Sequence, residues 1–163
     1  MPVPAAIAHA ADEFHYNNNF ATKFVNDLSH DEWFKRPEGA CNHIAWVMGH
    51  LIWSRKAVVS RLGGNWSAPW LGLFARGEKL DESAAYPSPD TLKDAFREVS
   101  AALDSAMENA TDESVAQPAP KPGPPSADGK VSGTVCFMAW HETYHVGQIS
   151  LIYALLGKKS LMG

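Results

Sequence analysis

Four stretches of this chain repeat apolar residues with the period of an α-helix, and this repetition constrains the fold more than any other feature. In the first stretch the spacings alternate between four and three residues, at Ile7, Ala11, Phe14, Asn18, Ala21, Val25 and Leu28. Such spacings place side chains on one face of a helix. Asn18 is the only polar member of this line, so we expect its amide to face an apolar interior.

Capping residues and helix breakers predict where the helices begin and end. Asn42 is expected to cap the second helix, which the pair Gly63-Gly64 ends. Ser88 followed by Pro89 predicts the start of the third helix. A capping box over residues 29–32 predicts one short helical turn after the first helix. The four predicted helices span approximately residues 7–29, 42–62, 88–110 and 133–156.

Two long connections join these helices. Residues 65–87 are rich in aromatic residues and glycine, and residues 117–130 hold five of the eleven prolines. Long connections of the first kind often border functional sites, and a proline-rich segment favours an extended crossing over the surface. The pattern therefore predicts an all-α fold, a four-helix bundle with long connections, in a single domain over residues 1–163.

Composition excludes several classes of protein. The formal net charge is −4 and the Lys and Arg residues form no basic run, so we expect no nucleic-acid partner. No stretch approaches the length of uncharged apolar residues that crosses a bilayer, so we expect no membrane partner. The N-terminus lacks the pattern of a secretory signal. Cys41 and Cys136 are therefore expected to be reduced thiols packed in the core of a cytoplasmic protein.

The predicted fourth helix carries a pair of histidines. His141 and His145 are four residues apart, which places them on one helix face about 6 Å apart along the axis. The same face continues through Gln148, Ile149 and Ile152, so both imidazoles should point into the bundle. Buried imidazoles need partners. This pair predicts a metal site, and two hydrogen-bonded core histidines are the alternative.

His50 is the best candidate for a third ligand. It lies on the apolar side of the second helix, between Val47 and Leu51. His43 lies about 10 Å away along the same helix, so it is expected to contact a substrate or a ligand rather than the ion. The remaining histidines are expected to be exposed on the surface: His9, His15 and His30.

Three protein ligands would leave one coordination position for water or substrate, as in catalytic zinc sites. Asn18 and Gln148 are polar groups on otherwise apolar faces. Each could hydrogen-bond a substrate or the free ring nitrogen of a ligand, and an ordinary buried amide contact is the alternative. The sequence identifies no catalytic residue.

The residues His141-Glu142-Thr143-Tyr144-His145 also match the zinc-protease pattern in which the glutamate is a general base. That class takes its third ligand from further along the chain, and no His, Asp or Glu follows His145 here. On a helix Glu142 lies about 100° from His141. We therefore expect Glu142 to be solvated and not to act as a catalytic base.

Two segments resemble the signatures of the DinB-like superfamily, which includes the YfiT-like metalloenzymes. Residues 42–51, Asn-His-Ile-Ala-Trp-Val-Met-Gly-His-Leu, resemble its second-helix signature. Residues 140–149, Trp-His-Glu-Thr-Tyr-His-Val-Gly-Gln-Ile, resemble its last-helix signature, His-x-x-x-His-x-Gly-Gln. The second motif is fairly specific, and the first has value only in combination with it.

The resemblance implies a four-helix bundle that holds one divalent metal ion, zinc or nickel, with His50, His141 and His145. It also implies a homodimer and a small-molecule substrate, since relatives include transferases and isomerases that use low-molecular-weight thiols. Three hypotheses follow: a metal-dependent thiol S-transferase or hydrolase, a non-catalytic metal-binding or stress-response module, and a bundle whose histidines only pack.

Overall fold

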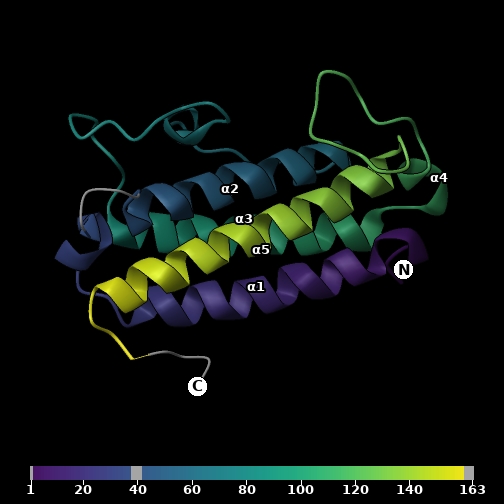
Figure 1. The fold of residues 1–163 in the computed structure, drawn as a ribbon. Coiled ribbons are helices and arrows are strands. Elements are labelled where there is room, and N and C mark those ends of the chain that lie inside the picture. Colours follow the sequence, from purple (N-terminus) through teal and green to yellow (C-terminus); the bar gives the residue numbers. More distant parts are fainter. Residues whose placement is uncertain (1, 38–41, 160–163) are drawn as a thin grey trace.

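Four long helices build the protein, and a computed structural model describes residues 2–37 and 42–159 of the chain. They lie side by side in a bundle (Figure 1): α1 (Ala8–Asn26), α2 (Ile44–Arg61), α3 (Pro89–Asn109) and α5 (Val131–Leu155). Shorter elements are η1 (Ala5–Ile7), η2 (Asp31–Phe34), η4 (Leu71–Phe74) and α4 (Asp112–Val115). Within the described residues there is no β-strand, and the predicted all-α bundle is confirmed.

Most of the residues predicted to begin or end a helix do so in the structure. The Ser88 hydroxyl accepts a hydrogen bond from the Thr91 backbone nitrogen at 3.1 Å, and Gly63 adopts a left-handed φ of 84° after α2. One predicted cap is wrong. α2 begins one residue later than expected, because the side chain of His43, not that of Asn42, accepts the hydrogen bond that caps it.

The order of the helices around the bundle follows from their contacts. α5 packs against both α1 and α2, and α3 packs against α2 and more loosely against α1. Consecutive helices α1 and α2 therefore lie diagonally across the bundle. The two long connections project from the side of α2 (Figure 1), so the chain is not a simple up-and-down meander.

The proline-rich connection, residues 117–130, is held by hydrogen bonds to Asp128 just before α5 begins. The carboxylate of Asp128 accepts hydrogen bonds from the backbone nitrogens of Lys130 and Gly133 and from the hydroxyls of Ser126 and Ser132. These bonds hold the pKa of Asp128 down to about 2. They fix the path by which the chain enters α5, the helix that carries two of the three candidate ligands.

The apolar faces meet in one core, with two differences from the predicted pattern. On α1 the buried amide is Asn17, which is 4% exposed, whereas Asn18 is half-buried. Five of the seven residues of the predicted face are buried, and Ala10 and Asn17 are buried in place of Ala11 and Asn18, because Asn17 bonds to α5. Cys136 is exposed rather than part of the core, and Cys41 lies outside the described residues.

None of the described helices combines the length and the apolar character needed to cross a membrane.

Candidate metal centre

Three histidines from two neighbouring helices converge at one point. One ring nitrogen from each of His50, His141 and His145 lies within 4.8 Å of the other two. The Nε2 atoms of His141 and His145 are 3.1 Å apart, because the helix repeat places residues four apart on one face of α5. His50 reaches this point from α2, which packs against α5.

Hydrogen bonds on the far side of two rings decide which nitrogen faces the cluster. The Nδ1 atom of His50 lies 2.8 Å from the backbone oxygen of Phe74, and that of His145 lies 2.7 Å from Oε1 of Gln148. Both oxygens only accept, so each Nδ1 carries the proton and donates. Each Nε2 therefore presents a lone pair, which is the form of histidine that binds a metal.

Burial keeps these imidazoles neutral. His50 and His145 are 7% and 9% exposed, and His141 is half-buried. Burial is the main cause that lowers the pKa of all three, and that of His145 falls to about 4. Proximity to His50 lowers the pKa of His141 and His145 further. At neutral pH each of the three rings is therefore neutral and has one nitrogen that can bind a metal.

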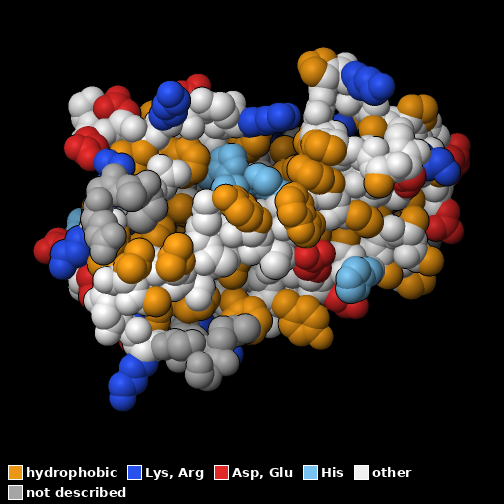
Figure 2. All heavy atoms as spheres, in the orientation of Figure 1, with side chains coloured by type: hydrophobic (Ala, Val, Ile, Leu, Met, Phe, Trp, Pro, Cys, Tyr) orange, Lys and Arg blue, Asp and Glu red, His pale blue; other side chains and the backbone are white. Residues whose placement is uncertain are grey.

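Aromatic side chains surround the cluster. The His50 ring is nearly parallel to the indoles of Trp46 and Trp53, with centroid distances of 5.3 and 5.7 Å. Phe137 stacks on His141 at 6.2 Å, and Tyr144 meets His145 edge-on at 5.1 Å. In the region of α2 and α5, histidine side chains reach the surface beside hydrophobic ones (Figure 2). The cluster is thus approached through an apolar, largely aromatic surround.

The donor set fits a divalent transition metal. Two nitrogens that each lie about 2.0–2.1 Å from a tetrahedral ion are roughly 3.3 Å apart, close to the 3.1 Å between the Nε2 atoms of His141 and His145. The Nδ1 atom of His141 is buried and has no hydrogen-bond partner among the described residues. Three neutral imidazoles suit zinc or nickel better than magnesium or calcium, which prefer oxygen ligands.

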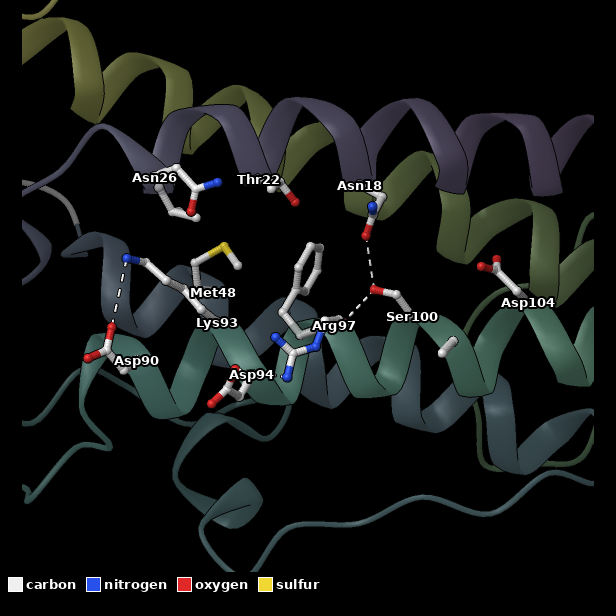
Figure 3. Close-up of a pocket in the computed structure, with 13 residues that line it drawn as sticks. Asn18, Thr22, Asn26, Met48, Asp90, Lys93, Asp94, Arg97, Ser100 and Asp104 are labelled. Carbon is white, nitrogen blue, oxygen red and sulfur yellow. Dashed lines mark hydrogen bonds and ion pairs between the residues drawn. The ribbon is translucent and has the colours of Figure 1, made fainter.

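Of the other predicted site residues, only Gln148 contacts the cluster, through its bond to His145. The Oδ1 atom of Asn18 accepts hydrogen bonds from Arg55 and from Ser100. Asn18 also lines a groove of about 640 Å³ between α1 and α3 (Figure 3), which no histidine lines. The structure therefore places Asn18 away from the three histidines.

His43 also makes its contacts elsewhere. Its Nδ1 atom accepts a hydrogen bond from the Trp46 backbone nitrogen at 3.0 Å and so caps α2. Its ring meets Phe34 and Tyr86 edge-on and lines a separate cavity of about 400 Å³. The three histidines that were expected to lie on the surface are exposed: His9, His15 and His30.

Glu142 was expected to be solvated, and this prediction is wrong. Glu142 is 1% exposed and forms an ion pair with Arg55, which is 2% exposed. The sequence carried a signal for this pair, because Arg55 lies on the apolar line of α2 between Leu51 and Val58. A cation in that position requires a buried partner of opposite charge. The carboxylate is bound on both oxygens, at 2.7 and 2.8 Å, to the Arg55 guanidinium.

Residues 14–149 match the family model described as the DinB superfamily, which spans most of the chain and all three histidines. The chain belongs to the DinB superfamily. A crystal structure described as a conserved protein from Enterococcus faecalis has the same fold, with a TM-score of 0.68 and 16% sequence identity. The alignment covers 93% of this chain and 98% of that one. No curated protein sequence matches this chain significantly.

Proposed function

We propose that this member of the DinB superfamily is a metal-dependent enzyme that acts on a small molecule, of the thiol S-transferase or hydrolase type. His50, His141 and His145 would hold one divalent ion, zinc or nickel. The observation that supports this most is the convergence of the three ring nitrogens within 4.8 Å, with the other ring nitrogen of His50 and His145 already occupied. Two hydrogen-bonded core histidines would also explain the 3.1 Å between His141 and His145, but they would not require a ring nitrogen of His50 to reach the same point.

The chain's own residues define what such a site can do. A bound ion would supply Lewis-acid chemistry, by lowering the pKa of a bound water or thiol. Phe74 and Gln148 hold the His50 and His145 rings in one tautomer. Trp46, Trp53 and the other aromatic neighbours restrict water around the histidines and offer an apolar surface to a substrate.

Metal content tests the proposal. Protein purified without chelator should contain about one equivalent of divalent metal per chain, and His50→Ala, His141→Ala and His145→Ala should each lose most of it. His43→Ala is the matched control, since its side chain lies in a different cavity. Unchanged metal content in the His50→Ala variant would exclude His50 as the third ligand.

Activity separates the enzyme from a non-catalytic metal-binding or stress-response module. Low-molecular-weight thiols would be screened with electrophiles in the presence of the metal-loaded protein. Turnover that disappears in His145→Ala supports the enzyme, and stoichiometric binding without turnover supports the module. A cytoplasmic location, where small thiols stay reduced, suits the enzyme.

A homodimer is part of the proposal. α5 presents an exposed apolar line at Trp140, Tyr144, Leu151 and Leu155, which are between 48% and 59% exposed. Exposed apolar patches of this kind mark interaction surfaces. Sedimentation of the wild type should give twice the monomer mass, and Leu151→Glu should shift it toward the monomer.

A further inference from the structure

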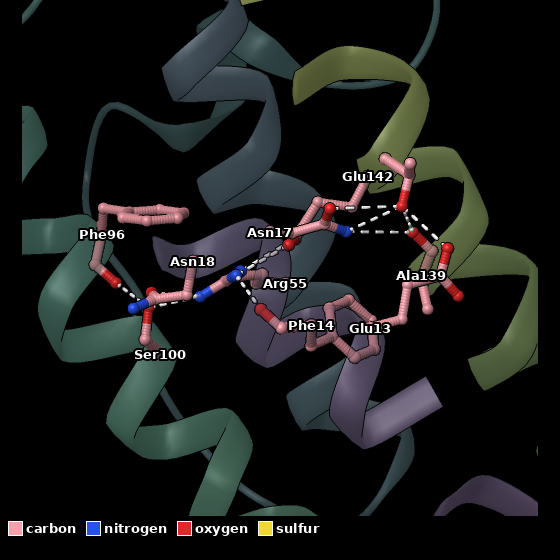
Figure 4. Close-up of polar contacts among 10 residues, drawn as sticks. Glu13, Phe14, Asn17, Asn18, Arg55, Phe96, Ser100, Ala139 and Glu142 are labelled. Carbon is pink, nitrogen blue, oxygen red and sulfur yellow. Dashed lines mark hydrogen bonds and ion pairs between the residues drawn. The ribbon is translucent and has the colours of Figure 1, made fainter. Parts of the chain in front are cut away.

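The guanidinium of Arg55 lies between the four long helices and connects them. Its Nε and Nη2 atoms donate to the two carboxylate oxygens of Glu142 on α5, at 2.8 and 2.7 Å. Its other hydrogen bonds reach α1, at the backbone oxygen of Phe14 and Oδ1 of Asn18, and α3, at the hydroxyl of Ser100 (Figure 4). One side chain from α2 thus bonds to the other three helices.

This ion pair and the histidine cluster join the same two helices on different sides. On α5, Glu142 lies about 100° around the helix axis from His141 and about 60° from His145. On α2, Arg55 lies about 140° around the axis from His50 and about 7.5 Å along it. α5 therefore cannot rotate or slide relative to α2 without breaking the bonds between Arg55 and Glu142.

Thr143, which follows Glu142 on α5, is hydrogen-bonded to α1. The Thr143 hydroxyl donates to Oε1 of Glu13 at 2.7 Å and accepts from Nδ2 of Asn17 at 2.9 Å, both on α1. Figure 4 shows Glu13 and Asn17 of α1 beside the Arg55 network. Two consecutive residues between His141 and His145 are therefore held by two different helices.

A metal site is sensitive to the rotation that these bonds prevent. Side-chain atoms lie about 5–6 Å from the axis of their helix, so a rotation of about 5° moves a ring nitrogen by about 0.5 Å. Functional sites require their groups to be held within roughly that distance. Small rotations of α5 would carry His141 and His145 together away from His50.

We propose that Arg55 and Glu142 are positioning residues that fix the rotation of α5 against α2, so that His141 and His145 meet His50 in a geometry able to bind metal. This inference rests on the proposed metal site. A buried ion pair can often be replaced by apolar residues without loss of stability. Its contribution here is the selection of one arrangement of α5, and that contribution can be separated from stability by experiment.

The test compares Co²⁺ binding by the full chain and by the double variant Arg55→Met/Glu142→Leu. Replacing both partners leaves no buried charge unpaired, so the metal-free variant should remain helical and melt cooperatively. We expect its affinity for Co²⁺ to fall by on the order of tenfold or more, as for other groups that orient ligands. The visible absorption spectrum of bound Co²⁺, which reports the coordination geometry, should also change.

A destabilised control separates positioning from stability. Leu103 on α3 is 1% exposed and belongs to the core, and Leu103→Ala should lower the melting temperature without altering the Arg55–Glu142 pair. We expect this variant to keep the wild-type Co²⁺ affinity and spectrum. An equal loss of affinity in Leu103→Ala would overturn the proposal, because affinity would then follow stability alone.

Two further outcomes are decisive. Wild-type affinity and spectrum in the double variant would overturn the positioning role and leave the proposed metal site standing. Absence of Co²⁺ binding by the wild type would overturn the metal site itself, and the positioning role with it. Should the double variant fail to fold, Arg55→Leu/Glu142→Met, which also leaves no buried charge unpaired, is held to the same criteria.

Discussion

The Nδ1 nitrogen of His50 donates a hydrogen bond to the backbone oxygen of Phe74, 2.8 Å away at the end of η4. The ring of the same Phe74 fills the space beside Gly49, the residue before His50, where an added Cβ would lie 2.3 Å from it. Phe74 therefore both orients the His50 ring and packs against the α2 backbone that carries it. The long connection between α2 and α3 is in this way part of the site.

Gly49→Ala should disturb the histidine cluster. The new methyl group would push the Phe74 ring aside and with it the oxygen that holds His50. We expect a loss of about 1–3 kcal/mol in the free energy of unfolding, as for an overpacked core, together with weaker metal binding. Chemical denaturation and a metal titration would measure both effects. Retention of wild-type stability would show that Phe74 moves away without penalty.

Gly147→Ala is the matched substitution on α5. Gly147 is exposed, and a Cβ built on it would meet no atom of the described residues within 4 Å. Alanine should stabilise the helix by roughly 0.5–1 kcal/mol, because glycine is the poorer helix former. An increase in melting temperature checks this. A decrease would mean that a partner molecule lies too close to Gly147 in solution to admit a methyl group.

Gln148→Leu should weaken metal binding while the fold remains. The substitution removes the acceptor for the His145 Nδ1 proton, so the ring is no longer held in the tautomer that presents Nε2. We expect a loss of about 10–100-fold in metal affinity, as for other hydrogen-bond partners of ligating histidines. Gln148→Glu, which keeps an acceptor, is the control and should retain most of the affinity.

The stability of the metal-free protein should fall as the pH falls from about 6.5 toward 4. The pKa of His145 is lowered from 6.5 to about 4, mainly by burial, so in this range the unfolded chain binds a proton that the folded chain does not. The free energy of unfolding therefore rises with pH across the range. The lowered pKa values of His43, His50 and His141 act in the same direction.

Denaturation at a series of pH values, in the presence of a chelator, measures this dependence. The shift of His145 alone corresponds to about 3 kcal/mol at 1.36 kcal/mol per pKa unit. His145→Gln should flatten the slope between pH 4 and 6.5. A slope equal to that of the wild type would show that His145 titrates normally in the folded protein.

Removal of the metal should lower the melting temperature but leave a helical protein that melts cooperatively. All four long helices contribute buried residues to one core, so the bundle does not depend on an ion for its folding, unlike a small structural zinc domain. A bound ion would stabilise it according to its concentration relative to the dissociation constant. Circular dichroism with and without chelator is the measurement. Complete loss of helicity on chelation would contradict this prediction.

The apolar repeat and the capping residues were enough to predict the helices, because both act over one or two turns of the chain. The stripe of α3 from Leu92 to Ala106 is buried, and its Ser88 cap is formed. The His141–His145 pair could be predicted for the same reason, since the helix repeat alone places these two residues on one face. These features required only local geometry.

Contacts between helices were decided by the tertiary structure. Asn17 rather than Asn18 is buried because α5 packs against α1, where Asn17 donates to Ala139 and Thr143. Glu142 is buried because α2 brings Arg55 opposite it. Sequence spacing places a side chain on one side of its own helix, and it does not state which helix lies on that side.

The sequence by itself therefore determined four helices, their approximate ends and a pair of histidines on one face of the last one. The tertiary structure decided that His50 meets that pair, that Phe74 and Gln148 select the tautomers, and that Arg55 and Glu142 join α2 to α5. The physical reason is the separation along the chain between the residues that interact. Helix periodicity and capping depend on neighbours within a few residues, whereas the Arg55–Glu142 bond joins residues 87 positions apart in the chain.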